Sequence, residues 1–544
     1  MPDRTLPDLP DLDQYRKQAK ELLRDARAGN PAAEARIRKH HPRLRNFDAE
    51  QRPGLTLADA QFVLTREHGY ASWPEFARHI ETLRIICSLD HLRDPHSTFL
   101  EVACVDRHGW HASGSLEHAE MLLARYAGVA SASIFSSAVV ADEAAVRDWL
   151  QRDRSLSAAK GGPHGWDALT YLCFSRYLRI DKERSDAFVA CARALLEAGA
   201  DANTGWVETI DDPPRPVREP AIYGAAGLAQ NPDLTQLLLD FGADPNDEET
   251  PYHVPETYDN AVLKILLASG RFNERSLATV AARKCDWHDD AGLALVLEYG
   301  ANPNFLTAWS HSPFQHSIRR DNGLAMVEQL LDHGADPWLA NASDGRNAFQ
   351  MAAWHGRADI LDSLARRGFK PEFRDLDELI ALCAHGQTEA ARALAAREPG
   401  LLAQLHTAGG TLLARFAGAA NDAGLRTLIV LGISPDALWA EGDGYWDLTA
   451  GSTALHVAAW RAHHTVVATL IAAGARVDAR DARQRTPLQL AVKACIDSYW
   501  KRRRQPDSVA ALLAAGASVD GIAWPTGYDA IDKLLRPDKE PAQT

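Results

Sequence analysis

One short pattern recurs along the chain: two apolar residues, two variable residues, then Gly-Ala, with an aspartate or asparagine soon afterwards. The glycines of this pattern are Gly199, Gly242, Gly300, Gly334, Gly474 and Gly516. From Gly300 to Gly334, and again from Gly334 to Gly368, the spacing is 34 residues. Glycine often ends a helix because it adopts the left-handed conformation without strain. A helix end that returns at this interval indicates copies of one short helical unit.

The stretch from Ser452 to Asp478 shows that unit most clearly. Thr453 is suited to cap a first helix, whose buried face would carry the small pair Ala458-Ala459. A second helix is predicted over 465–473, because its apolar residues fall on one face, and Gly474 would end it. Such a helical pair cannot bury its apolar stripes alone, so it needs a similar pair on each side.

Motifs at the start of several units resemble those of ankyrin repeats. The clearest are Thr453-Ala-Leu-His-Val-Ala-Ala459 and Thr486-Pro-Leu-Gln-Leu-Ala491, and weaker forms begin at Ser312 and Asn347. The resemblance is clear over 300–374 and 451–522 and eroded over 97–300 and 375–450. It implies an all-α fold, a solenoid of helix-turn-helix repeats with β-hairpin or loop fingers, and binding of proteins as the general function.

Three parts are expected along the chain. Residues 1–92 would form a small helical unit, 97–536 a solenoid of about twelve repeats, and 537–544 a tail. The segment Leu57–Pro74 resembles a short extension ahead of the repeats in bacterial ankyrin-like proteins, which implies no known activity. The polar, proline-rich stretch 204–219 is expected to be an enlarged finger between repeats, and the alternative is a polyproline ligand for another protein.

Composition narrows the class of partner. The formal net charge of −14 argues against nucleic acid and anionic membranes as ligands, since both require many Lys and Arg side chains. Seven cysteines form no C-x-x-C pair, and Cys173 and Cys383 align with the small packed position of Ala459. We therefore expect buried thiols, a reducing compartment and a cytoplasmic protein. No signal peptide or membrane-spanning run is recognisable, and we expect a monomer.

A search for catalytic and cofactor motifs finds none, so no cofactor, no metal and no enzymatic activity are expected. The stretch Cys285–Asp290 gathers residue types that bind metals, but its place between two predicted helices favours an exposed loop. His456 belongs to the repeat motif, and His463 lies where ankyrin repeats usually carry a histidine. Both are interpreted as structural residues that form hydrogen bonds rather than as catalytic bases.

The remaining candidate site is the inner face of the repeats. The two residues that follow the small pair in each unit are expected to point into a concave groove. These are Trp354, His355, Trp460, Arg461, Arg283, Lys284, Arg319 and Arg320. Tryptophan and arginine often anchor protein interfaces, so the predicted ligand is an acidic or amphipathic protein segment. The alternative is that the tryptophans pack against neighbouring repeats.

Three functions are compatible with this pattern. The first is a non-catalytic scaffold or adaptor that binds proteins through the groove and the loop tips. The second is an inhibitor or immunity-type protein that masks one partner enzyme, with one tight partner in place of several weak ones. The third is a cryptic enzyme in the eroded middle, which a deep pocket with converging His, Asp or Glu side chains would favour.

Overall fold

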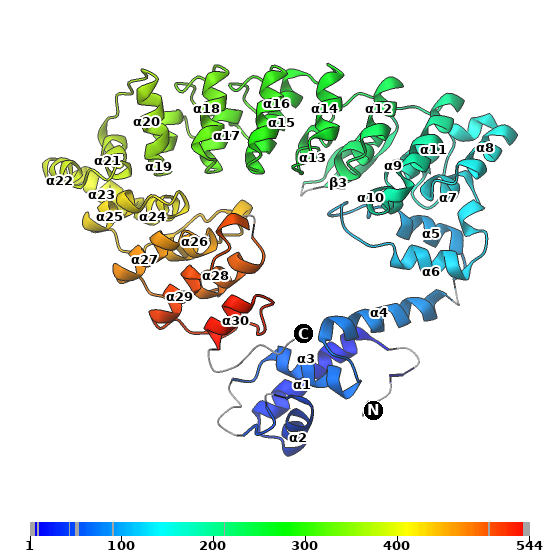
Figure 1. Ribbon diagram of the computed structural model, residues 1–544, viewed down its shortest axis with the longest axis horizontal. Helices are drawn as coiled ribbons and strands as arrows, with labels where there is room; N and C mark the ends of the chain where they lie inside the picture. The colour runs from blue at the N-terminus through cyan, green and yellow to red at the C-terminus, as the bar shows by residue number, and fades with distance from the viewer. Residues whose placement is uncertain are drawn as a thin grey trace. The chain divides into compact units, whose positions relative to one another are not determined.

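The chain is mostly helical (Figure 1). It divides into two compact units, Met1–Asp244 and Pro245–Thr544. The computed structural model describes residues 6–7, 10–42, 44–48, 54–89, 92–210, 213–498 and 501–536, with the backbone alone at 84–89 and 501. The predicted tail at 537–544 lies outside the described residues. The predicted division at 92–97 stays a prediction, and residues on both sides of it belong to the first unit.

The first unit contains twelve described α-helices, a π-helix and two short antiparallel sheets. The α-helices are α1 Leu12–Arg27, α2 Pro31–His40, α3 Leu57–Glu67, α4 Trp73–Leu89, α5 Pro95–Ala103, α6 Glu117–Arg125, α7 Ile134–Val139, α8 Glu143–Arg152, α9 Ala168–Cys173, α10 Arg176–Ile180, α11 Ser185–Ala198 and α12 Pro232–Asp240. The π-helix η5 spans Tyr223–Leu228. The strands are β1 Lys160–Gly161, β2 Trp166–Asp167, β3 Gly205–Ile210 and β4 Arg215–Pro220.

Helices α1 to α4 pack around two clusters of buried apolar side chains. Leu22, Ile37 and Leu64 belong to the larger cluster, and Tyr15 packs edge-on against Phe76 in the smaller one. The start of α3 is determined by its local sequence, because the Thr56 side chain caps this helix in a reciprocal capping box. These four helices therefore have a core of their own within the first unit.

The described parts of the proline-rich stretch 204–219 form two paired strands, in agreement with the predicted finger. Strands β3 and β4 pair antiparallel from Gly205 opposite Pro220 to Ile210 opposite Arg215. The π-helix η5 follows directly, and a side chain on its Gly224 would collide with the carbonyl oxygen of Cys173. The glycine therefore allows close approach of this turn to the preceding helix pair.

The second unit contains eighteen described α-helices and one two-stranded sheet. The helices are α13 Thr250–His253, α14 Ala261–Ala268, α15 Glu274–Asp286, α16 Asp290–Glu298, α17 Pro313–Arg319, α18 Leu324–Asp332, α19 Ala348–Trp354, α20 Ala358–Arg366, α21 Asp375–Ala384, α22 Thr388–Arg397, α23 Pro399–Thr407, α24 Gly409–Gly418, α25 Asp422–Val430, α26 Ala454–Trp460, α27 His464–Ala472, α28 Pro487–Ile496, α29 Asp507–Ala514 and α30 Asp529–Leu535. The 3-10 turns η6 and η7 span Gly444–Trp446 and Lys501–Arg503. Strands β5 Leu438–Trp439 and β6 Ser452–Thr453 pair antiparallel.

The helical pair at 452–478 forms as the sequence predicts. The Nδ1 atom of His456 accepts a hydrogen bond of 3.1 Å from the Thr453 backbone N–H, and its Nε2 lies 3.1 Å from the Arg485 carbonyl oxygen. His463 Nε2 lies 2.8 Å from the carbonyl oxygen of Gly418. Both histidines are thus structural, as expected. Ala458 and Ala459 are fully buried where α26 packs between α24 and α28.

Stacking of the first helix of each pair is continuous at both ends of the second unit and interrupted once. Helices α15, α17, α19 and α21 contact one another in series, as do α24, α26 and α28. Between these runs, the extra helix α23 lies against α21 and α24, and α21 packs against α25, the second helix of the next pair. This irregularity falls in the stretch 375–450, where the repeat pattern is eroded.

Because of this interruption, the turns that follow first helices far apart in sequence come together. The Arg461 guanidinium, after α26, lies 3.0 Å from the Asp321 carboxylate, after α17. The Asn421 side-chain amide donates hydrogen bonds to the carbonyl oxygens of Gly356 and Ala384, at 2.6 and 2.7 Å. The inner ends of the two runs therefore face each other across a short gap.

Two helix boundaries near the C-terminus differ from expectation. A lengthened helix over 488–504 is predicted, but α28 ends at Ile496, and that prediction is wrong. Asp497 leaves the helical conformation, with φ −137° and ψ 82°. A closing helix over 522–535 is also predicted, but α30 begins only at Asp529. Pro525 accounts for the late start, since proline disfavours helical backbone at the preceding residue.

We call the segment 434–451 the insertion. It packs closely against α24 at Gly410. A Cβ atom at Gly410 would lie 2.0 Å from the carbonyl oxygen of Leu438 in the insertion, whereas one at Gly400 on α23 would meet nothing. Gly410→Ala should cost ~1–3 kcal/mol in the free energy of unfolding because of this overlap. Gly400→Ala should be neutral or slightly stabilising, since alanine favours helices. Chemical denaturation followed by circular dichroism measures both, and equal stability of the two variants would contradict the packing.

Candidate functional site

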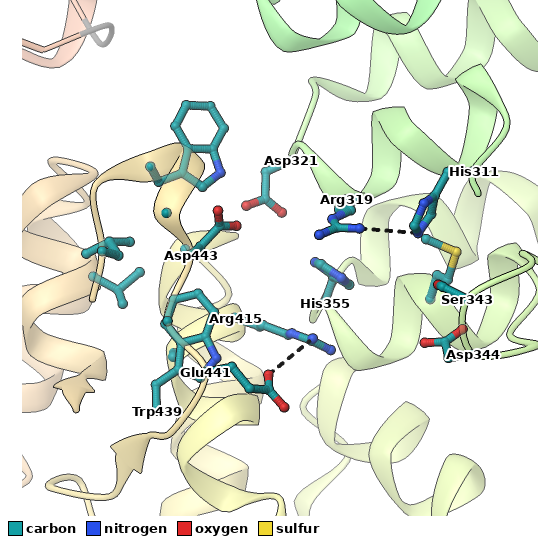
Figure 2. A pocket seen from close by; sticks show the side chains of 18 of the residues that line it. His311, Arg319, Asp321, Ser343, Asp344, His355, Arg415, Trp439, Glu441 and Asp443 are labelled. Atoms are coloured by element: carbon teal, nitrogen blue, oxygen red, sulfur yellow. Dashed lines mark hydrogen bonds and ion pairs between the residues drawn. The ribbon is translucent and has the colours of Figure 1, made fainter. Parts of the chain in front are cut away.

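A cavity of about 350 Å³ lies within the second unit, where the two runs of helices face each other (Figure 2). One wall comes from α17, the loop before α19, and the end of α19. The opposite wall comes from α24, α26 and the insertion. Its polar lining includes His311, Arg319, Asp321, Ser343, Asp344, Arg346, His355, Arg415, Glu441, Asp443 and Arg461.

The insertion closes one side of the cavity, and its Tyr445 contacts the ends of α15 and α17 in the opposite run. The Tyr445 hydroxyl donates a 2.9 Å hydrogen bond to the Asp286 carbonyl oxygen at the end of α15. The Arg320 guanidinium lies 3.7 Å from the centre of the Tyr445 ring, and that of Arg461 lies 4.7 Å from the centre of the Trp446 ring. These cation–π contacts hold η6 in place.

Three arginines from different elements reach the cavity. Arg346 in the loop before α19 pairs with Asp344 at 3.0 Å. The Arg415 guanidinium on α24 has a more distant partner, the Glu441 carboxylate at 4.0 Å, whose side chain is 68% exposed. Arg319, at the end of α17, lies 3.5 Å from the His311 ring, and no carboxylate among the described residues pairs with it. Positive charge is therefore incompletely compensated on this side.

His355 lies between Arg319 and Arg415 (Figure 2). Burial lowers its pKa well below the usual value, and the charges of Arg415 and Arg319 lower it further, as do those of Arg357 and Arg346. Burial also lowers the pKa of Arg415. The imidazole of His355 is therefore neutral at physiological pH, and the cavity wall around it carries the charge of the guanidinium groups.

Negative charge lies on the far side of the cavity. Asp321 pairs with Arg461, and burial raises the pKa of the Asp321 carboxyl. The Asp443 side chain caps η6 by accepting a 3.0 Å hydrogen bond from the Tyr445 backbone N–H. Asp321 and Asp443 thus form an acidic side of the cavity, and the other side, around His355, holds three arginines together with the carboxylates of Asp344 and Glu441.

Three of the eight residues predicted for the groove line this cavity: Arg319, His355 and Arg461. Arg461 is buried in its pair with Asp321, so only Arg319 and His355 present polar atoms to the cavity without a carboxylate partner among the described residues. Sequence reasoning missed Arg346 and Arg415. Neither follows a small pair: Arg346 lies in the loop before α19, and Arg415 reaches the cavity of His355 only because the two runs face each other.

The other five predicted groove residues lie elsewhere or are engaged within the chain. Trp460 is 3% exposed, and the Lys493 ammonium lies 4.9 Å from the centre of its ring. The Trp354 indole N–H donates a 2.7 Å hydrogen bond to Asp377. The tryptophans thus pack and bond inside the second unit, which is the alternative considered from the sequence.

The basic residues at the end of α15 are also engaged. Lys284 is 0% exposed, and its ammonium lies 2.8 Å from the Asp289 carboxylate. Arg283 is buried and pairs with Asp286 at 2.6 Å, while Arg320 reaches the same carboxylate at 2.6 Å. The expected projection of the pair Arg283 and Lys284 into a groove is not seen, because α15 continues through Asp286 and keeps both side chains in helical packing.

Asp286 is a buried centre of charge that the sequence does not reveal. The stretch Cys285–Asp290 is expected to be an exposed loop, but Asp286 and Asp289 are buried. Burial alone would raise the pKa of Asp286. The hydrogen bond with His316 and the charges of Arg320 and Arg283 instead hold that pKa below its usual value. The expectation of an exposed loop is wrong because Asp286 pairs with His316 and Arg320 of the next repeat, and Asp289 pairs with the buried Lys284.

Comparisons with known proteins agree with the repeat pattern at one place. Residues 450–482 match the family model described as ankyrin repeat. This ankyrin repeat comprises α26, α27 and the turn after them, which is where the sequence pattern is clearest. A crystal structure of the human ASB11 ankyrin repeat domain is similar to 44% of this chain over 99% of its own length, with 20% identity and a TM-score of 0.32.

Two further properties of the described residues bear on the class of site. None of the described helices combines the length and apolarity needed to cross a membrane. No group of three or more His, Cys, Asp or Glu side chains in the described ranges is arranged to hold a metal ion. The described cysteines Cys173 and Cys383 are buried free thiols, as predicted.

His253 on α13 gives the second unit a pH-dependent stability. Burial would lower its pKa, but hydrogen bonds with Glu249 and Glu256, each at 3.1 Å, raise it to about 9. Glu256 also pairs with Arg283. Because the folded-state pKa exceeds the unfolded value of about 6.5, the charged histidine stabilises the fold below pH 6.5, and this contribution is lost as the pH rises through 9.

The expected result is a loss of ~1–3 kcal/mol of unfolding free energy between pH 6.5 and 9.5 that His253→Gln abolishes. Urea denaturation across this pH range measures it. His333→Gln serves as the control, since His333 lies on the surface at the end of α18. A pH profile of His253→Gln that parallels the wild type would contradict the assigned network.

Proposed function

We propose that this protein is a non-catalytic scaffold or adaptor that binds another protein through a solenoid of ankyrin-like helix pairs. The ankyrin repeat at 450–482 and the serial contacts among α15 to α21 and α24 to α28 support this proposal. We also propose that the solenoid spans 97–536 and that the protein is a cytoplasmic monomer related to the bacterial type of ankyrin-repeat protein. Its binding partner is a protein, because ankyrin repeats generally mediate protein–protein interactions.

The observation that carries the binding site is the pair of arginines without close carboxylates in the cavity. Arg319 has none among the described residues, and Arg415 has only the exposed Glu441 at 4.0 Å. Partly buried guanidinium groups gain most from a charged acceptor when water is excluded. The proposed contact is therefore an acidic group of the partner against Arg319, Arg346, Arg415 and His355. It replaces the wider stripe suggested by the sequence.

A catalytic role is the second candidate, because the cavity gathers His355, Asp321 and Glu441 and shifts the pKa of the first two. The arrangement favours binding. A base or nucleophile is normally activated by a hydrogen-bonded partner. Among the described residues, no carboxylate or hydroxyl forms such a bond with His355, and the Ser343 hydroxyl donates instead to Asn341 at 2.7 Å.

The test compares two double variants that each remove two positive charges. Arg319→Gln with Arg415→Gln changes the cavity, whereas Arg392→Gln with Arg397→Gln changes exposed residues of α22. Tagged proteins capture partners from lysate, and the bound proteins are quantified by mass spectrometry. The cavity variant should lose its partner at least about tenfold relative to the control variant, since hydrogen bonds to charged groups are worth ~1.5–3 kcal/mol each.

The same capture separates a scaffold from an inhibitor. Several partners at substoichiometric levels indicate a scaffold, and one partner at a one-to-one ratio indicates an inhibitor of that partner. If both double variants retain the same proteins as the wild type, the cavity is not the binding site. Circular dichroism of each variant verifies that the helical content is unchanged.

A further inference from the structure

Two guanidinium groups at the cavity wall, those of Arg319 and Arg415, lack a close carboxylate partner among the described residues. Arg319 approaches from α17 and Arg415 from α24 (Figure 2), and Arg346, in the loop before α19, also lines the cavity. A partly buried cation without a close counter-charge is unfavourable unless a ligand supplies that charge. The positive end of the cavity is therefore arranged to receive an anion.

Trp439 of the insertion is an independent sign of a missing acceptor. Its side chain is 7% exposed and lines the cavity beside Arg415 (Figure 2), and its buried indole N–H has no hydrogen-bond partner among the described residues. Buried polar groups are nearly always paired, so an unpaired donor at a cavity wall indicates a place for an acceptor. Neutral His355, between the arginines, adds a further N–H donor on the same side.

We propose that this cavity binds a phosphoryl group. Three guanidinium groups and an indole N–H from different walls suit a tetrahedral group with three terminal oxygens and nearly two negative charges better than a planar carboxylate with two oxygens and one charge. The volume of about 350 Å³ exceeds that of one phosphate, so it leaves room for a group to which the phosphate is attached. This inference rests on the proposed function and names the ligand chemistry of its site.

Glu441 occupies the place of a competing internal anion. Its carboxylate lies 4.0 Å from Arg415, and it is held only by the exposed insertion. The phosphoryl group takes over the interaction with Arg415, and Glu441 turns into solvent. Removing the Glu441 charge should therefore tighten phosphate binding, whereas removing Arg319 or Arg415 should weaken it. Asp344 keeps its pairing with Arg346, and Asp321 keeps its pairing with Arg461.

The experiment titrates the full chain with three probes by isothermal calorimetry at pH 7.5. The probes are inorganic phosphate, a phosphoserine peptide, and the same peptide with glutamate in place of phosphoserine. Wild type should bind phosphate, Arg319→Gln and Arg415→Gln should bind it at least about tenfold more weakly, and Glu441→Gln should bind it more tightly. Arg392→Gln, on the exposed face of α22, is the matched control and should bind like the wild type.

A second readout follows the imidazole itself. The pKa of His355 is depressed by burial and by Arg415, Arg319, Arg357 and Arg346, so a bound phosphoryl dianion should raise it. His311, 3.5 Å from Arg319, faces the same charges. Proton NMR of the His355 ring, assigned with His355→Gln, should show this rise at saturating phosphate. A merely structural effect of the arginine substitutions would not produce a ligand-dependent shift in the wild type.

Each outcome decides between the possibilities. Tighter binding of the phosphoserine peptide than of phosphate assigns the group to a phosphorylated partner, and equal binding assigns it to free phosphate. Binding of the glutamate peptide without binding of phosphate overturns the phosphoryl inference but leaves the acidic-partner proposal standing. If no probe changes the calorimetric signal or the His355 resonance at millimolar concentration, the phosphoryl inference is wrong, whereas the proposed scaffold function is judged separately by the capture experiment.

Discussion

A single interruption of helix stacking gives the second unit its site. Helices α15 to α21 and α24 to α28 each pack in series, but the proline-initiated helix α23 separates the two runs and directs α21 against α25. Each repeat contacts only its neighbours, so an irregular step changes direction without disturbing the helix pairs on either side. The turns after α17 and α26 consequently meet in the pair of Asp321 and Arg461, and a groove surface becomes the wall of a cavity.

Local features of the fold could be predicted from the sequence because they depend on neighbouring residues. Thr453 and His456 form the capping contacts at the start of α26, and Gly474 has a positive φ of 84° at the end of α27. The roles of His456 and His463 follow from their positions in the motif. The course of the eroded stretch could not be predicted, since it depends on contacts such as that of Asn421 with Gly356, 65 residues apart.

The residues of the candidate site likewise divide into those that could be predicted from the sequence and those that could not. Arg319 and His355 could be predicted because each follows a helix whose period is visible in the sequence. Arg346 and Arg415 could not, because one lies in a loop and the other on α24 within the eroded stretch. Lys284 is expected to face a groove and Asp286 to lie in an exposed loop, but both side chains are buried. The Lys284 ammonium donates a hydrogen bond to the Thr257 carbonyl oxygen, and Asp286 pairs with His316, so both side chains stabilise contacts between repeats that the local sequence does not reveal.

The insertion supplies what a regular repeat lacks. A repeat uses its first helix for packing against both neighbours, so few positions on it are free to carry unpaired polar groups. Lengthening a loop between repeats costs little, since the entropy of loop closure grows slowly with length. The insertion brings an indole N–H at Trp439 and a carboxylate at Glu441 to the basic wall, and aromatic contacts of Tyr445 and Trp446 anchor it. Ligand binding and helix stacking therefore depend on different residues. The helix pairs fix the distance between the two cavity walls, and the insertion adds polar groups that can contact a ligand between them.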